Sequence, residues 1–169
     1  MRRELDRAEL EGWLRDAAKL WLAHDGLWFQ AVERALGTEE AIRLDAEAWR
    51  RFSPIEARRI LARLGREPGG GIPLLVEAIE HRLYALLNRQ ETIEVTDRRA
   101  VFRMLECRVQ EARARAGLPD FPCKRVGLVE YGEFARTIDP RLEVRCLTCP
   151  PDPPPGGHWC AWEFTLRDA

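Results

Sequence analysis

The spacing of apolar residues changes near Asn88, and this change constrains the fold more than any other feature. Between residues 8 and 36 apolar side chains recur every three or four positions, which is the period of an amphipathic helix. After Asn88, Ile93 and Val95 alternate with polar residues, which is the period of a strand. The change predicts an α+β fold in one domain, residues 1–169, with a helical part over 1–88 and a sheet part over 89–169.

The helical part is predicted to contain four helices, separated at glycine and proline. Gly26 follows His24 and Asp25 and is expected to break or kink the first helix, because glycine costs about 1 kcal/mol relative to alanine inside a helix. The Ser53-Pro54 pair is typical of an N-cap and a first turn. The expected helices therefore cover 8–36, 38–52, 54–64 and 73–88, with a flexible connector at 66–71.

The second part is predicted to form an antiparallel sheet of about four strands. The expected strands lie around 92–96, 100–107, 142–146 and 159–166, and short helices are expected at 110–116 and 122–137. In the last two strands one face carries Leu142, Val144 and Cys146, and one carries Cys160, Trp162, Phe164 and Leu166. These strands are expected to pair as a hairpin with the proline-rich stretch at its tip.

Charge and cysteine content narrow the class of protein. The formal net charge is −1, so the sequence lacks the basic excess of a nucleic-acid-binding protein. The first residues show no apolar stretch of a secretory signal, and no apolar run approaches the ~18 residues that span a bilayer. We therefore expect a cytoplasmic protein that binds neither nucleic acid nor membrane, with its five cysteines as thiols or metal ligands rather than disulfides.

Three of the cysteines lie within CLTCPPDPPPGGHWCAW, residues 146–162. On a continuous strand Cys146 and Cys149 would point to opposite faces, but Pro150 ends the strand and permits a turn that brings the two thiols together. Cys160 is expected to face them from across the hairpin. Cys123 lies in the first turn of a predicted helix, where the helix dipole stabilises a thiolate, and is the expected fourth member.

Four convergent thiolates predict a structural Zn²⁺ site at Cys123, Cys146, Cys149 and Cys160, because zinc prefers tetrahedral sulfur ligation and a closed shell leaves no position for water. Cys107 and His158 are alternatives for the fourth ligand. An iron–sulfur cluster would use the same thiolates, and inert buried thiols behind a rigid turn are a further alternative. A redox Cys-x-x-Cys site is disfavoured because proline follows its second cysteine.

The stretch from Leu105 to Leu166 resembles the vinyl-4-reductase-type small-molecule-binding domain, which also forms the sensing part of phenol-responsive bacterial regulators. In those sensors zinc is held by a cysteine, then an acidic residue and a second cysteine, then a cysteine on the final strand. The resemblance implies that Cys123, Cys149 and Cys160 take the cysteine positions. Cys146 falls where the acidic ligand would be, which implies an all-thiolate site.

The whole chain, through HDGLWF at 24–29, CPPD at 149–152 and WCAWEF at 159–164, also resembles a family of uncharacterised bacterial cytosolic proteins. That family is distantly similar to L-2-amino-thiazoline-4-carboxylate hydrolases. The resemblance implies a fold of this type, and it raises hydrolysis as an activity to consider.

A candidate ligand pocket surrounds the polar interruption of the first helix. Asp25 falls on an apolar stripe, where a carboxylate is costly unless it is paired. The predicted pocket residues are Trp21, His24, Asp25, Trp28 and Phe29. The alternative is that Asp25 caps a helix break and His24 is exposed. Glu130, Tyr131 and Glu133 are interpreted as a solvated helix face rather than as pocket groups.

These observations favour a non-catalytic homodimer that binds a small apolar or aromatic molecule and uses its metal structurally. The alternative function is a hydrolase of the thiazoline-carboxylate type, with His24 or Asp25 as acid or base. A third possibility is a partner-binding module that docks through the proline-rich tip.

Overall fold

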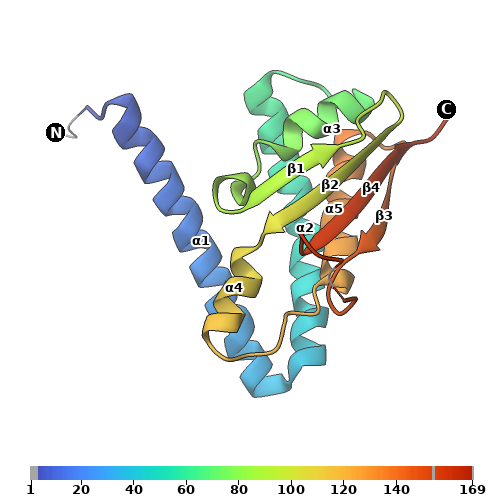
Figure 1. Cartoon of the computed structure of the whole chain (residues 1–169). Helices are drawn as coiled ribbons and strands as arrows, with labels where there is room; N and C mark the ends of the chain where they lie inside the picture. Colours follow the sequence, from blue (N-terminus) through green and yellow to red (C-terminus); the bar gives the residue numbers. More distant parts are fainter. Residues whose placement is uncertain (1–3, 154, 169) are drawn as a thin grey trace.

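The structure is a computed structural model that describes residues 4–153 and 155–168. Its elements in chain order are α1 (Arg7–Leu36), α2 (Thr38–Leu64), α3 (Gly71–Ile79), the 3₁₀ helix η1 (Leu83–Leu86), β1 (Arg89–Ile93), β2 (Arg99–Glu106), α4 (Arg108–Arg115), α5 (Lys124–Ile138), β3 (Leu142–Thr148) and β4 (Cys160–Leu166). A helical part followed by a four-stranded antiparallel sheet confirms the predicted α+β fold (Figure 1).

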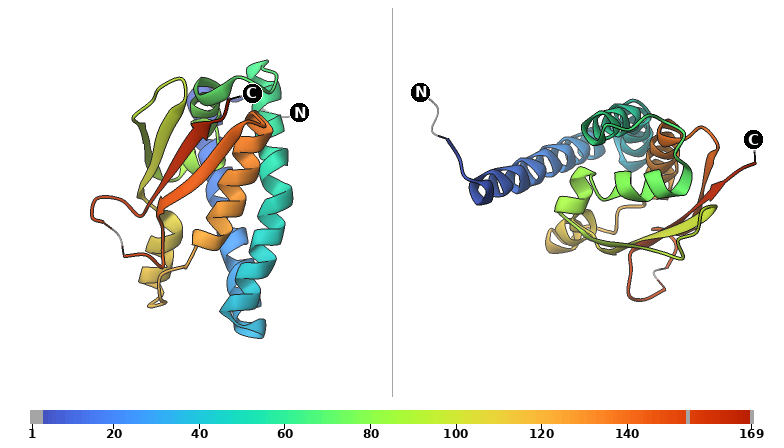
Figure 2. Two further views of the ribbon diagram at one scale, coloured as in Figure 1. Left: turned by 90° about the vertical axis from the view of Figure 1, so that its right-hand side faces the viewer. Right: turned by 90° about the horizontal axis from the view of Figure 1, so that it is seen from above.

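The strand order in the sheet is β1-β2-β4-β3, so the last strand is inserted between β2 and β3. Pairing of β3 with β4 confirms the predicted hairpin, and the register shifts between Cys146 and Thr148. Helices α2, α3 and α5 cover one face of the sheet (Figure 2). The core lies on this side, where Leu142, Cys160, Trp162 and Phe164 are buried in one cluster.

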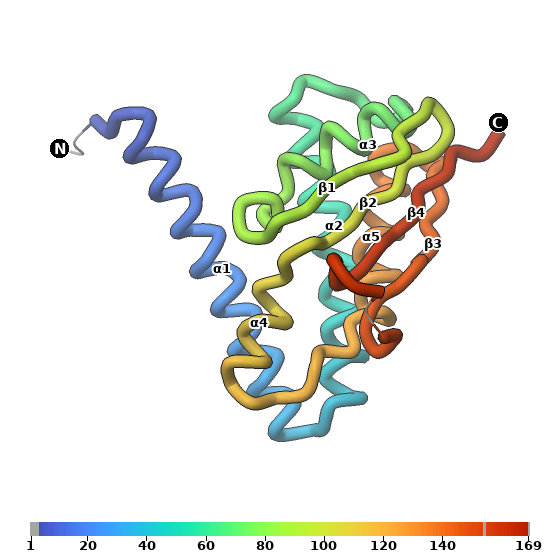
Figure 3. Tube along the Cα trace, in the orientation of Figure 1, coloured from blue at the N-terminus to red at the C-terminus, as the bar shows by residue number. Residues whose placement is uncertain are grey.

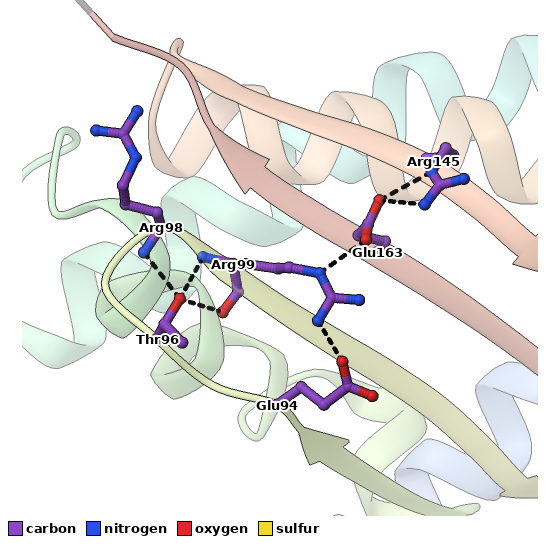
Figure 4. A network of polar contacts seen from close by, with 6 residues as sticks. All are labelled: Glu94, Thr96, Arg98, Arg99, Arg145 and Glu163. Carbon is purple, nitrogen blue, oxygen red and sulfur yellow. Dashed lines mark hydrogen bonds and ion pairs between the residues drawn. The ribbon is translucent and has the colours of Figure 1, made fainter.

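The opposite face of the sheet is open and carries a ladder of ion pairs (Figure 4). Glu163 on β4 accepts hydrogen bonds from Arg99 Nε and from Arg145 Nε, each at 2.8 Å. Arg99 also pairs with Glu94, which lies just beyond β1. The ladder therefore links β2, β4 and β3 on the side away from the helices.

The predicted break in the first helix is wrong, because α1 is continuous through Gly26. The helix begins with a capping box, in which Asp6 accepts from the Glu9 backbone N–H and Glu9 accepts from that of Asp6. A single glycine costs about 1 kcal/mol, and packing of the flanking turns against the body outweighs this cost. Asp25 is therefore not a helix cap.

The predicted boundary at Ser53-Pro54 is also wrong, because α2 runs from Thr38 to Leu64 with Pro54 inside it. Proline removes one helical hydrogen bond and costs about 3 kcal/mol in an isolated helix. In α2, buried residues occur on both sides of Pro54, from Ala41 to Leu61, so tertiary packing holds the two segments in one helix.

The helix predicted over 73–88 ends early, at Ile79, because Arg82 adopts extended backbone angles that turn its side chain into the interior. The chain then forms η1 and enters β1 at Arg89, earlier than expected. Val95 lies outside the strand and is half exposed, and Glu94 before it has a positive φ of 53°. The alternation of Ile93 and Val95 thus marks a turn rather than a strand centre.

The N-terminal half of α1 projects away from the rest of the molecule (Figures 1 and 3). Ala18 is the one buried residue that α1 contributes among those described. Among the described helices, α1 included, none is long and apolar enough to cross a membrane.

Candidate functional site

A cavity of about 490 Å³ lies between the middle of α1 and the part of the sheet that carries Cys160. Its walls also include residues of α2, η1, α4 and α5. The lining surface is mostly apolar, and the groups that supply it include Leu22, Phe29, Trp49, Met104, Phe121, Val126 and Trp162. Its size and its predominantly apolar lining are those of a site for a small organic molecule.

Two aromatic pairs shape the wall. The rings of Phe29 and Phe121 meet edge to face with their centroids 4.8 Å apart. The rings of Tyr131 and Trp162 lie 4.9 Å apart. Gly127 permits the second arrangement, because a Cβ at this position would lie 2.6 Å from the Trp162 ring. Glycine on α5 therefore lets the helix and the indole pack directly behind the cavity.

Three carboxyl groups from three different helices face this cavity, namely Asp25 of α1, Asp45 of α2 and Glu130 of α5. Burial raises the pKa of Asp25 above its usual range, and the nearby His24 opposes this effect only in part. Burial, together with the charges of Asp25 and Glu130, raises the pKa of Asp45 to about 7. Interaction with the Trp49 side chain opposes this rise in part. The acids thus form one electrostatically coupled group.

Glu130 differs from the other two acids because it has a cationic partner. Arg82 is 2 % exposed, and its guanidinium lies 2.8 Å from Glu56 and 2.7 Å from Glu130. The rings of Trp49, Tyr84, Tyr131 and Phe134 surround the same guanidinium at 4.7–5.9 Å. Among the described residues, no ion pair reaches Asp25 or Asp45. The cavity therefore presents two carboxyl groups that lack a cationic partner within the described chain.

The structure separates the five predicted pocket residues. Asp25 and Phe29 line the cavity, whereas Trp21, His24 and Trp28 are not among the lining residues. Trp21 instead packs into an aromatic cluster behind the wall, with Trp49, Phe52 and Tyr84 at 5.5–6.1 Å. Trp28 is 68 % exposed. The residues of one helix turn point in all directions, so a contiguous stretch cannot supply one wall.

The interpretation of Glu130 and Tyr131 as a solvated face is wrong, because both are buried and both line the cavity. Asp45 and Arg82 were missed as well. A signal for Asp45 does exist in the sequence: it falls on the same helical stripe as the buried residues Ile42 and Trp49. A carboxylate on such a stripe, like Asp25, is costly to bury without a function or a partner.

Four of the five cysteines also line the cavity, namely Cys107, Cys123, Cys149 and Cys160. The sulfur atoms of Cys123 and Cys149 are 3.4 Å apart. Interaction with the Cys123 and Cys160 thiols raises the pKa of Cys149, and interaction with Cys149 lowers the pKa of Cys160. The Cys146 thiol is half-buried outside the cavity lining, and burial raises its pKa to about 11.

The proline-rich tip is anchored to the start of α5. The Lys124 ammonium lies 2.8 Å from Asp152, and the Lys124 backbone N–H donates to the Pro150 carbonyl at 3.0 Å. On the other side of the tip, the Trp159 N–H donates to the Met104 carbonyl at 2.7 Å. Cys123, which directly precedes α5, is held next to Cys149 by these contacts.

The donors at this position suit zinc chemically. Zn–S bonds of about 2.3 Å place two sulfur ligands about 3.8 Å apart, close to the 3.4 Å between Cys123 and Cys149. Across residues 4–153 and 155–168, however, no group of three or more His, Cys, Asp or Glu side chains is arranged to hold a metal ion. The four-cysteine zinc site therefore stays a prediction.

Comparisons with known proteins identify the family of this chain but do not indicate an activity. Neither the curated proteins nor the solved structures contain a match to this chain. One family model, described as a family of unknown function (DUF6125), matches residues 3–166. Because this match covers nearly the whole chain, the protein belongs to that family of unknown function.

Proposed function

We propose that the protein is a cytosolic small-molecule-binding protein whose ligand occupies the 490 Å³ cavity. The observation that carries this proposal is the combination of an apolar and aromatic wall with two unpaired carboxyl groups, Asp25 and Asp45. Such a wall takes up an aromatic or aliphatic body, and the carboxyl groups favour a protonated amine or another hydrogen-bond donor on it. Free cysteines fit a reducing compartment.

We further propose that Zn²⁺ on cysteine thiolates stabilises the wall opposite α1. Cys123, Cys149 and Cys160 would hold it, with Cys146 as the fourth ligand and Cys107 as the alternative. The ion would supply a cross-link between the start of α5, the tip of the hairpin and β4. Support comes from the 3.4 Å contact between the Cys123 and Cys149 thiols and from the resemblance to zinc-containing sensor domains.

Binding can be tested with N-phenyl-1-naphthylamine, a neutral apolar fluorophore, and a matched pair of variants on α4. Ala112 lines the cavity and Ala114, two residues on, does not, while both are exposed. Ala112→Trp is expected to weaken probe binding at least tenfold, and Ala114→Trp to leave it unchanged. Equal affinity in both variants, or no binding to the native protein, would contradict the proposal.

The metal is tested separately by elemental analysis of the purified native protein. One zinc per chain is expected, together with loss of zinc in Cys149→Ser and its retention in Cys107→Ser. Iron in place of zinc would indicate a cluster, and loss of zinc in Cys107→Ser would make that residue a ligand. If neither metal is found, the zinc part of the proposal fails while the cavity remains.

A second candidate function is hydrolysis, favoured by one observation. The pKa of Asp45 is raised to about 7, where a carboxyl group can donate and accept protons in a cavity beside Asp25. His24, the other predicted catalytic residue, is not among the lining residues. Incubation with L-2-amino-thiazoline-4-carboxylate and chromatography of the products tests this candidate. Turnover that disappears in Asp45→Asn would support it, and absence of turnover would exclude this substrate.

A further inference from the structure

Helix α1 carries a second apolar stripe that is exposed along its length, although Leu27 at one end of it also reaches the rim of the cavity. Its packed face includes Ala18, Asp25 and Phe29. The other stripe repeats every seven residues, with Leu10, Ala17, His24 and Ala31 at one position and Trp13, Leu20 and Leu27 at the next. All seven are exposed, Trp13 at 65 %, Leu20 at 71 % and Leu27 at 66 %. A heptad of this kind is the pattern of a helix that pairs with another helix.

The N-terminal half of α1 projects from the body, so its apolar residues have no partner there among the described residues. The projecting segment, residues 7–17, is short enough to be marginal as an isolated helix in water, yet none of residues 4–17 is buried against the body. Leu14 and Trp28 flank the stripe and are 52 % and 68 % exposed. Together with Leu10, Trp13, Leu20 and Leu27, they offer on the order of 800 Å² per chain, which is the contribution of one partner to a standard stable interface.

We propose that two copies of this chain pair antiparallel through α1. Antiparallel pairing about a point between Ala18 and Lys19 sets Leu10 against Leu27, Trp13 against His24 and Ala17 against Leu20 of the second copy. Each contact then joins a large side chain to a small or compatible one. A parallel pair would instead set His24 against His24 and Trp13 against Trp13, with the projecting halves still outside both bodies.

The charges on α1 favour a second copy over a membrane as the occupant. Over residues 1–19 five acidic and five basic side chains balance, so this segment lacks the Lys/Arg excess that draws an amphipathic helix to an anionic lipid surface. In the antiparallel pair Asp16 flanks Ala23 of the second copy and faces no like charge. The dimer also fixes the α1 wall of the cavity, because His24 in the interface adjoins Asp25 in the cavity.

Sedimentation equilibrium at micromolar concentration tests the proposal. The native chain is expected to be a dimer, Leu10→Glu and Leu20→Glu are expected to be monomers, and Arg15→Glu, on the far side of α1, is expected to remain a dimer. Both leucines are exposed, so circular dichroism of the monomers is expected to match the native spectrum. A native monomer, or a dimer that survives both substitutions, overturns the proposal; a monomer that sediments with anionic vesicles assigns the stripe to a membrane instead.

Cross-linking tests the orientation. Under mild oxidation, a mixture of Ala17→Cys and Leu20→Cys chains is expected to give more disulfide-linked dimer than either chain alone, with the native protein as background for its own cysteines. Cross-linking that is strongest for Leu20→Cys alone would show a parallel pair and overturn the antiparallel arrangement.

Discussion

The two faces of the sheet each carry a cluster of charges, and the two clusters behave in opposite ways. On the helix-covered face, Arg82 is enclosed with Glu56 and Glu130 beside the cavity acids, and burial raises the pKa of Asp25, Asp45 and Glu130. On the open face, Arg145 and Arg99 lower the pKa of Glu163. Similar ion pairs therefore have different energetic consequences, because access of water decides whether desolvation or attraction dominates.

The largest effect is expected at the buried cluster. Arg82→Met is expected to lower the free energy of unfolding by about 3–5 kcal/mol, because it strands two buried carboxylates. The same change in the open ladder, Arg145→Met, is expected to cost less than about 1 kcal/mol, since that arginine is 69 % exposed. Urea unfolding at neutral pH measures the free energy of unfolding of both variants. Similar losses in the two would show that the buried and open clusters do not differ in energy as proposed.

A combined variant shows where this cost arises. If stranded carboxylates cause it, adding Glu56→Gln and Glu130→Gln to Arg82→Met should recover most of the lost stability, because neutral amides are cheaper to bury. If stability stays as low as in Arg82→Met alone, the packing of the guanidinium among its four rings carries the energy instead.

The next largest effect concerns Asp45 and its pH dependence. Its pKa rises from 3.8 to about 7 on folding, so between these values the folded chain binds more protons and native stability falls as pH rises. Asp45→Asn removes this loss. Its stability should match that of the native protein near pH 4 and exceed it at pH 8 by up to about 4 kcal/mol, the equivalent of roughly three pKa units. Glu47→Gln, at an exposed position of the same helix, is the control, and parallel pH curves for native protein and Asp45→Asn would contradict the raised pKa.

The smallest effect is expected at Glu163, with the opposite sign. Its pKa is lowered on folding, so its contribution is present above the ordinary value of 4.5 and is lost as pH falls through the folded value. Glu163→Gln should cost about 1 kcal/mol at pH 7, less in high salt and nothing at strongly acidic pH. Thermal unfolding over this pH range measures the difference; a cost that persists in acid would mean that Glu163 acts through packing.

The raised pKa of Asp45 on the helix-covered face also bears on the proposed ligand. A charged Asp45 in the interior lowers the stability of the folded protein, so the residue is expected to serve a purpose other than stability. The proposed purpose is the binding of a cationic group. The Asp45→Asn variant should then weaken binding of phenethylamine about tenfold and leave binding of neutral N-phenyl-1-naphthylamine unchanged. Equal losses for both probes would point to a change in cavity shape rather than in charge.

Much of the fold could be predicted from local pattern. The change of period at Asn88, the strand alternation in Leu142–Cys146 and the turn residues around Pro150 each depend on neighbours in the chain, so they predicted the class and the last hairpin. The breaks at Gly26 and Pro54 were predicted from local cost alone. They failed because long-range packing on both sides of each residue outweighs a penalty of about 1–3 kcal/mol.

The candidate site was predictable only in parts. Asp25 and Phe29 could be found because a carboxylate on an apolar stripe is an evident anomaly. The cysteines could be grouped because three of them lie within one predicted hairpin, which brings them close in space. Asp45, Glu130 and Arg82 come from three separate segments, and no local pattern links them.

By itself the sequence determined the secondary-structure class and the helical and sheet parts, because these follow from periodicity and from turn chemistry. Only the tertiary structure decided that Asp25, Asp45 and Glu130 share one cavity with the thiols of Cys123, Cys149 and Cys160. The physical reason is that burial and charge coupling depend on which helices pack together, and packing joins residues that are distant in the chain.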